Sequence, residues 1–479
     1  MTDDVDRVGA DRRACVQPVT RRTQLPLCAN QERQLLVEEA WRLTSRALTP
    51  LNGVAIRHLV GPLDRAALQD ALTSLVRRHA ALRSSIWPAT TSATRVVAAA
   101  AYLRHGTSRS GLYQQSIVER VGVPLRVRAL DSQPASVESD LQAIVAHEIA
   151  EAFDYGAPPL IRAALVALEP DRHALILVAP HIVVDGWSFH VLVRDLLSLY
   201  AERIGGGPGV PRLKMQFHDF AVWQRDQTRT PMFGDAVDYW KAQWCAFGDA
   251  LLHQSDFPAP LAAASTAGRG TGIETAVLSR ENVERLSAFR RRMRVTLHHL
   301  MLTVAAVRLA HVTGRSRIAL WEYYLNRTLP GSEDVVGWFG HAHLAGIDIS
   351  TATTVGALLQ AVRNDAFERF AHHQLSTAKL FEVWTPPRHG ALGVGVDVNP
   401  ASPIRELGPL RVEPMRLGIP PPMSLRLTAE TGRDTLRLGV VYDRAVFDDG
   451  FVRDLFGDFQ RTLLRFADDP TLSVRAHDG

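Results

Sequence analysis

Residues 180–188 read PHIVVDGWS, and this stretch decides how the rest of the chain is interpreted. Before it, residues 160–168 and 173–179 are largely apolar and are separated by a short turn-like segment, as in two buried strands. After it, leucines at helical spacing predict a helix over 188–202. The stretch therefore predicts a joint between a buried strand and a helix, which is a common place for functional side chains.

The joint carries one polar pair, His181 and Asp185, followed by Gly186. A histidine at the end of a rigid strand can present a ring nitrogen to a cleft, and Gly186 lets the backbone approach a ligand. Equally, His181 and Asp185 could cap the helix and satisfy each other. A metal pair lacks a third ligand at a recognisable spacing, and Ser188 lacks the GxSxG elbow of a nucleophile. The residues alone leave these interpretations open.

The composition describes an ordinary globular chain. Of 479 residues, 46% are hydrophobic and 22% charged, and 54 Lys and Arg are nearly balanced by 50 Asp and Glu. This excludes bulk disorder and gives no basic stripe for nucleic acid. The three cysteines, Cys15, Cys28 and Cys245, form no zinc or disulfide pattern, and no apolar stretch reaches the length of a membrane span. We expect a cytoplasmic protein without a metal site.

Helical and strand patterns alternate along the chain, which favours an α/β (α+β layered) fold. The glycine-rich linker GGGPGVP suggests a boundary between two lobes. We expect a disordered leader (1–22), an N-terminal lobe (23–205), a bridge (206–270) and a C-terminal lobe (271–475).

Motifs in a fixed order connect these segments to a known family. The joint resembles the HHxxxDGWS signature of the condensation domains of nonribosomal peptide synthetases. Other stretches match that family's motifs in order: CANQER (28–33), RHAALR (78–83), FHDFAVW (217–223), NRT (326–328), VGWF (336–339) and HQ (373–374). The resemblance covers about residues 24–475.

The resemblance implies two chloramphenicol-acetyltransferase-like lobes in a V, with a central tunnel that admits two phosphopantetheine arms. By matching position, His181 is the residue that orients or deprotonates the acceptor, and the Gly186 amide is the candidate oxyanion contact. Asp185 is expected to pair with Arg194 and to hold the shape of the loop without touching substrate. The resemblance implies no bound cofactor, because the substrates are carried on the phosphopantetheine of a partner.

The C-terminal lobe departs from the family in the residues expected to face the tunnel. Glu322 is interpreted as a contact to a cationic acceptor or a partner of Arg327; it also falls where related epimerisation domains carry a glutamate, but their GHGRE motif is absent. Trp321 faces either the tunnel or the lobe interior. The full set of candidate substrate contacts is Trp321, Glu322, Tyr324, Asn326, His341 and His343. Because His341 and His343 alternate on a strand, they share one face, either as substrate contacts or as hydrogen-bonded interior residues.

Pro180 replaces the first histidine of the signature. The favoured hypothesis is still a free-standing condensation enzyme of antibiotic or other secondary metabolism. It would join a thioester on a separate carrier protein to a small amine or alcohol, with no nucleic acid or membrane partner. Two alternatives remain: a noncatalytic recruitment domain, which Pro180 supports, and an acyltransferase that uses acyl-coenzyme A.

Overall fold

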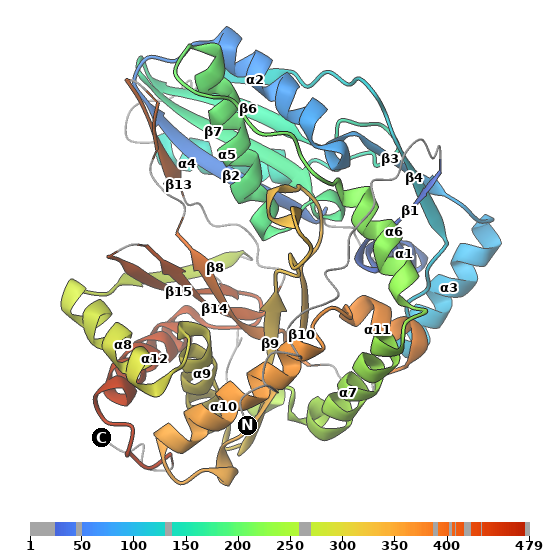
Figure 1. The fold of residues 1–479 in the computed structure, drawn as a ribbon. Helices are drawn as coiled ribbons and strands as arrows, with labels where there is room; N and C mark the ends of the chain where they lie inside the picture. The colour runs from blue at the N-terminus through green and yellow to red at the C-terminus, as the bar shows by residue number, and fades with distance from the viewer. Residues whose placement is uncertain are drawn as a thin grey trace, which may run out of the picture.

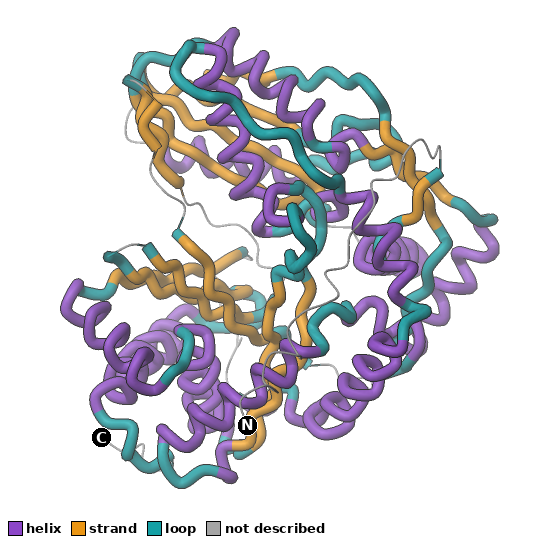
Figure 2. The backbone as a smooth tube through the Cα atoms, viewed as in Figure 1, coloured by secondary structure: helices purple, strands orange, loops and turns teal. Residues whose placement is uncertain are grey.

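The structure is a computed structural model. It describes residues 24–44, 50–129, 137–257, 270–386, 391–401, 405–407, 409–415, 423–432 and 434–474. The expected leader at 1–22 lies outside the described residues, as does the alanine- and proline-rich part of the expected bridge at 258–268. Figure 1 shows two lobes of sheet and helix, one above the other and joined along one side, and Figure 2 shows that each contains its own sheet.

The first lobe is built on a six-stranded sheet in the order β12-β13-β2-β7-β6-β5. All neighbours are antiparallel except β5 and β6. Its strands are β2 (Asn52–Val60), β5 (Leu125–Ala129), β6 (Arg162–Glu169), β7 (Arg172–Pro180), β12 (Arg405–Leu407) and β13 (Leu410–Met415). The strand pair expected before the joint is thus confirmed as β6 and β7.

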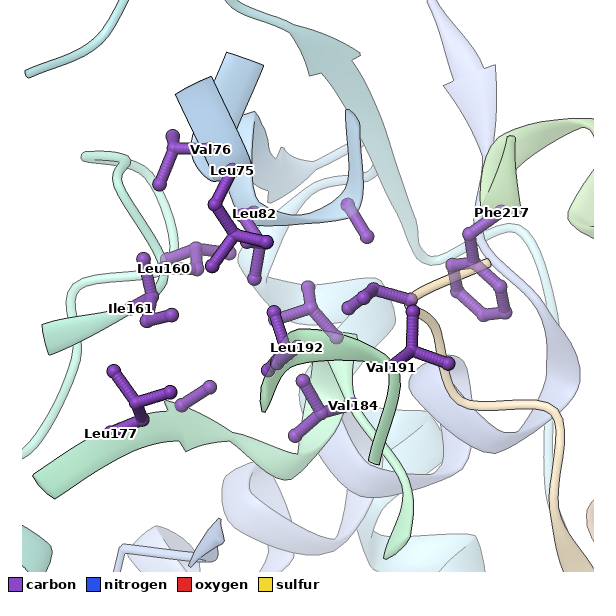
Figure 3. Packing of buried hydrophobic residues seen from close by; sticks show 14 of the residues in the cluster. Leu75, Val76, Leu82, Leu160, Ile161, Leu177, Val184, Val191, Leu192 and Phe217 are labelled. Atoms are coloured by element: carbon purple, nitrogen blue, oxygen red, sulfur yellow. The ribbon is translucent and has the colours of Figure 1, made fainter. Parts of the chain in front are cut away.

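Helices cover both faces of this sheet, which explains why its central strands are apolar throughout. Alternate residues of β7 point to opposite faces: Leu175 and Leu177 pack in the main core with α2 (Arg65–Arg78) and α5 (Gly186–Arg203), while Ile176 packs against α4 (Val137–Ala150). Figure 3 shows part of this main core, to which Leu75 of α2, Leu177 of β7 and Leu192 of α5 belong.

The remaining elements of the first lobe form a small layer beside the main sheet. They are β1 (Leu25–Pro26), α1 (Ala29–Leu43), β3 (Ser84–Pro88), α3 (Ser92–His105) and β4 (Tyr113–Ile117). The strands pair in the order β1-β4-β3. α1 packs on α3 and also contacts the short helix at His181–Val183 that follows β7. The small layer therefore contacts the joint through α1.

The second lobe has its own six-stranded mixed sheet, in the order β10-β9-β11-β14-β15-β8. Its strands are β8 (Thr271–Val277), β9 (Arg317–Tyr324), β10 (His341–Asp348), β11 (Val394–Pro400), β14 (Leu425–Thr431) and β15 (Leu436–Asp443). Its helices are α8 (Arg280–Met293), α9 (Leu297–Thr313), α10 (Val355–Ala371), α11 (Thr377–Val383) and α12 (Asp449–Asp468). The strands β14 and β15 pair antiparallel as a hairpin near the C-terminus.

The boundary between the lobes is not a single point in the sequence. β12 and β13 come from the C-terminal part of the chain, yet β13 pairs with β2 in the first sheet. The expected bridge also divides, because α6 (Phe217–Gln227) packs in the core of the first lobe whereas α7 (Pro231–Phe247) packs on β9 and β10 of the second. The chain thus crosses between the lobes repeatedly.

Among the described helices, no single one has both the length and the apolar composition to cross a bilayer. Within the described residues, only α8 and α9 taken together reach that length and composition, and they are bent by 97° at the break between them.

Candidate functional site

His181 follows directly from the end of the central strand β7. Pro180 is the last residue of that strand and has no N–H to donate, but the next amide, that of His181, donates to the Leu51 carbonyl at 2.8 Å. The strand is therefore held at its end despite the proline, and His181 is the first side chain beyond it. Pro180 in place of the first signature histidine therefore removes the imidazole side chain, but the backbone at this point stays hydrogen-bonded to Leu51.

The His181 ring is half-buried and lies edge-on to the indole of Trp338, with ring centroids 4.3 Å apart. Its Nδ1 atom is buried and forms no hydrogen bond with a described residue. Burial lowers the pKa of this imidazole, while the charge of Asp185 and its own backbone carbonyl oppose that shift without cancelling it. His181 is consequently neutral near pH 7 and has a lone pair available to accept a proton.

Asp185 is the N-cap of α5 and its carboxylate is saturated by protein donors. Oδ1 accepts the backbone N–H of Ser188 at 2.8 Å, the Ser188 hydroxyl at 2.7 Å and the Arg327 guanidinium at 2.8 Å. Oδ2 accepts the amides of Phe339 and Gly340, both at 3.1 Å. Burial opposes ionisation, but Arg327 and Ser188 hold the pKa of Asp185 below its ordinary value. Asp185 therefore ties the joint to the segment between β9 and β10.

The expected pairing of Asp185 with Arg194 is wrong. Arg194 lies more than two helical turns along α5, where its side chain binds Asp195 at 2.9 Å and Asp334 at 2.7 Å. Arg327 of the NRT motif takes the place next to Asp185 instead. The sequence contained Arg327 in a quoted motif, but only the fold shows that it reaches across to the other lobe.

Gly186 is the first residue of α5 and is exposed. Its N–H forms no bond with a described residue, as expected for the first amides of a helix, and a side chain added here would meet no atom within 4 Å. An unbonded amide and the positive end of the helix dipole thus lie five residues after His181.

Glu322 does not contact Arg327, and that interpretation is corrected. Its carboxylate, 4% exposed, binds the His298 ring at 2.8 Å, Arg369 Nε at 2.6 Å and the Tyr324 hydroxyl at 2.7 Å. Burial favours the neutral acid, but the charge of Arg369 and the contact with His298 hold the pKa of Glu322 well below its usual range. Since protein groups occupy both oxygens, Glu322 is a buried ion-pair partner and not a contact for a cationic acceptor.

Three other predicted residues of the second lobe, Trp321, Asn326 and His343, contact groups of the protein itself. Trp321 packs against Trp244 of α7, so the interior alternative holds for it. Asn326 has a left-handed backbone (φ 51°) and donates to the Phe339 carbonyl. His343 stacks on Trp240 with centroids 3.7 Å apart and bonds to the Leu375 carbonyl at 2.6 Å, which places it in the interior.

His341 is the exception on this strand. It is buried on the same face as His343, and its ring lies 6.0 Å from that of Tyr324. Burial lowers its pKa to about 4, so the imidazole is neutral, and neither ring nitrogen completes a hydrogen bond with a described residue. His341 thus keeps unused hydrogen-bonding capacity next to the segment that covers His181.

Sequence reasoning missed the roles of Trp338, which contacts His181, and of Arg369, which binds Glu322. Trp338 lies in the quoted VGWF motif, whereas Arg369 carries no local signal. Within the described residues, no group of three or more His, Cys, Asp or Glu is arranged to hold a metal ion.

Comparison with known families gives one match that covers almost the whole chain. The family model described as the condensation domain matches residues 21–478. Tyrocidine synthase 2 of Brevibacillus parabrevis is 28% identical over 375 residues, which cover 78% of this chain and 9% of that protein. Phosphinothricin tripeptide synthetase PhsC of Streptomyces viridochromogenes is 28% identical over 336 residues, 70% of this chain and 29% of that protein. The chain therefore spans less than a third of these curated relatives.

Solved structures share the fold. The X-domain from teicoplanin biosynthesis, solved in complex with OxyB, has a TM-score of 0.75 at 22% identity, covering 98% of this chain and 99% of that one. The first condensation domain of the calcium-dependent antibiotic synthetase, in complex with a substrate analogue, has a TM-score of 0.73 at 18% identity, covering 95% and 99%. At these identities the likeness concerns the fold alone.

Proposed function

This chain belongs to the condensation-domain family, and on that premise we propose that it joins an acyl or aminoacyl thioester to an amine or alcohol. The donor is carried on the phosphopantetheine arm of a carrier protein, and the product is an amide or ester. The observation that carries the proposal is the neutral His181 imidazole, set at the end of a rigid strand and followed closely by the unbonded Gly186 amide.

In the proposed reaction, the acceptor nitrogen or oxygen attacks the thioester carbonyl. His181 takes the acceptor proton, an effect worth about a hundredfold to ten-thousandfold in rate where general base catalysis operates. The Gly186 N–H opposes the negative charge that develops on the carbonyl oxygen. When the C–S bond breaks, the proton passes to the departing thiolate, so the products are one amide or ester and one free thiol. The unbonded ring nitrogens of His341 make it the proposed second-lobe contact to substrate.

The test is product formation with acylated carrier proteins and a panel of amines and alcohols, followed by mass spectrometry. We expect His181→Ala to lose at least about a hundredfold in kcat/KM while its circular dichroism spectrum stays unchanged. A parallel arm with acyl-coenzyme A tests the alternative of a carrier-independent acyltransferase. Equal turnover by His181→Ala and the unmodified protein would exclude His181 as the catalytic base.

A matched pair of variants isolates the Gly186 amide. Proline is tolerated at the first position of a helix, and the preceding Asp185 is already extended, so Gly186→Pro removes the N–H while its ring stays compatible with the start of the helix. Gly186→Ala keeps the N–H and has open space for its methyl group. We expect Gly186→Pro to lose about a hundredfold in kcat and Gly186→Ala to retain activity. Equal activity of the two variants would show that the Gly186 N–H does not stabilise the developing oxyanion.

A second candidate function is the binding of a partner protein without catalysis. Two observations favour it: Pro180 replaces a signature histidine, and a similar fold was solved in complex with another protein, OxyB. Saturable binding of a carrier or enzyme, without turnover of any thioester in the assay above, would support this function over the first.

A further inference from the structure

A second hollow lies at the far end of α5, away from His181. It is an open hollow with a volume of about 650 Å³, and it is lined by the C-terminal turns of α2 and α5 and by the loop that leads into α6. Figure 1 shows α2 and α5 side by side on the first lobe. At 1.5 Å per residue, the lining residue Leu199 is about 20 Å along the helix from Gly186. This cavity is therefore separate from the proposed catalytic site.

The lining combines an apolar part with a strongly cationic part. Five cationic side chains line the cavity against two carboxylates, Glu202 and Asp219. The cationic side chains are Arg77, Arg78, Arg203, Arg212 and Lys214. Asp219 is already engaged, because it accepts the Gln216 amide at 2.8 Å. Positive charge is consequently in excess around the hollow.

Two of the cations maintain the structure and the other three are available. Arg78 donates to Asp195 at 2.7 Å and to the Pro211 carbonyl at 2.5 Å, and Arg203 donates to the Ser74 hydroxyl at 2.7 Å. The side chains of Arg77, Arg212 and Lys214 are exposed, and within the described part of the chain none of them has a hydrogen-bond or ion-pair partner. These three can turn toward an anion in the cavity.

The apolar part of the lining comes from one residue of α5 and three of the loop. These are Leu199, Val210, Leu213 and Met215. Leu199 and Met215 are buried and the other two are half-buried, so the accessible apolar surface comes mainly from Val210 and Leu213. Small-molecule sites typically have volumes of about 300–1,000 Å³ and combine apolar walls with a few polar anchors. The cavity fits that description.

We propose that this cavity binds a small organic phosphate, with its apolar or aromatic body on Val210 and Leu213 and its phosphate among Arg77, Arg212 and Lys214. Guanidinium groups bind phosphate oxygens in a bidentate manner, and several cations around one site suit a multiply charged phosphate better than a singly charged carboxylate. The proposal does not depend on the condensation activity, because the cavity shares no residue with the catalytic site.

The experiment is isothermal titration calorimetry of the full chain with three probes. ADP supplies an aromatic body and phosphates, pyrophosphate supplies the charge alone, and adenosine supplies the body alone. We expect saturable binding of ADP that weakens with added salt, weaker binding of pyrophosphate, and the weakest binding by adenosine. The double variant R77A/R212A should bind ADP about tenfold or more weakly.

Two controls locate the binding. Arg453→Ala removes an arginine of α12 that is 67% exposed, and it should leave ADP binding unchanged. His181→Ala should also leave it unchanged, which separates this cavity from the catalytic site. The proposal is overturned if neither ADP nor pyrophosphate binds saturably, or if R77A/R212A and the unmodified protein bind ADP equally.

Discussion

At the scale of single residues, the neutral state of His181 gives the proposed reaction a defined pH dependence. Its pKa lies below the ordinary value of 6.5, because burial disfavours the imidazolium ion. Protonation removes the lone pair that accepts the acceptor proton, so activity falls as pH falls through this lowered pKa and is constant above it. We expect kcat/KM to be flat from neutral pH upward, with its acid limb centred below pH 6.5.

A pH profile of kcat/KM with a saturating carrier-bound donor checks this prediction. The residual activity of His181→Ala should lack the acid limb, which assigns the limb to this ring. An acid limb that stays in His181→Ala would assign the titration to another group.

The Asp185–Arg327 ion pair gives a second residue-scale prediction. Both side chains are buried, 8% and 4% exposed, so removing Arg327 leaves an unpaired carboxylate inside the protein. We expect Arg327→Ala to lower the free energy of unfolding by about 3–5 kcal/mol. Arg194→Ala should cost about 1 kcal/mol or less, because Arg194 is 36% exposed and Asp195 keeps Arg78 and His79 as partners.

Urea unfolding followed by tryptophan fluorescence measures both values. The depressed pKa of Asp185 stabilises the fold above the carboxyl's unfolded pKa, and this contribution is lost as pH falls through the folded pKa. The free energy of unfolding of Arg327→Ala should therefore fall less on acidification than that of the unmodified protein. A larger loss of unfolding free energy in Arg194→Ala than in Arg327→Ala would contradict this prediction and favour Arg194 as the partner of Asp185.

At the scale of elements, the segment between β9 and β10 determines what covers His181. The Gly337 N–H in this segment donates to the Ser188 hydroxyl at the start of α5, at 3.1 Å. A Cβ atom here would lie 2.2 Å from the Phe217 ring of α6, so the segment fits against α6 only with glycine. We expect Gly337→Ala to lower stability by about 1–3 kcal/mol and to reduce activity, because Trp338 must move with it.

The control for that substitution is Gly186→Ala, in which the added methyl group meets no atom within 4 Å. Its stability should stay within about 0.5 kcal/mol of the unmodified protein. Thermal unfolding and the condensation assay measure the two effects. Equal stability of Gly337→Ala and Gly186→Ala would show that the segment can leave α6 without cost.

At the scale of the whole molecule, the core of the first lobe is completed by residues from the C-terminal part of the chain. The core of the first lobe includes Leu329 and Phe339 from the segment after β9 and Val412 from β13. Val412 is 1% exposed and lies opposite Leu59 of β2. We expect Val412→Asp to destabilise the fold by about 3 kcal/mol or more, because it buries an unpaired charge. It should also reduce activity, since the same core supports the joint at His181.

Differential scanning calorimetry provides the measurement. The unmodified protein should unfold in one transition, and Val412→Asp should broaden it or divide it into two. Arg411→Ala is the matched control in the same strand, because Arg411 is exposed and forms an ion pair with Glu413 that is only partly buried. A single unshifted transition in Val412→Asp would show that β13 does not couple the lobes.

Local sequence patterns are sufficient to predict the helices and strands around the site. Asp64 precedes a run of leucines at helical spacing, as an N-cap does, and its carboxylate accepts the Ala67 amide at 2.9 Å. The apolar runs before the joint form β6 and β7. They are apolar throughout because helices cover both faces of that sheet. The pairing of β13 with β2 has no local signal, since strands more than 300 residues apart are brought together only by the folded chain.

The sequence by itself determined the family, the order of strand, joint and helix, and the position of His181 at the end of β7. These follow from periodicity and from motifs of adjacent residues, which depend on local geometry. Only the tertiary structure decided the partners: Arg327 and not Arg194 for Asp185, Arg369 and His298 for Glu322, and Trp338 for His181. The physical reason is that buried charges and rings must find partners in space, and in this protein those partners come from elements distant in the chain.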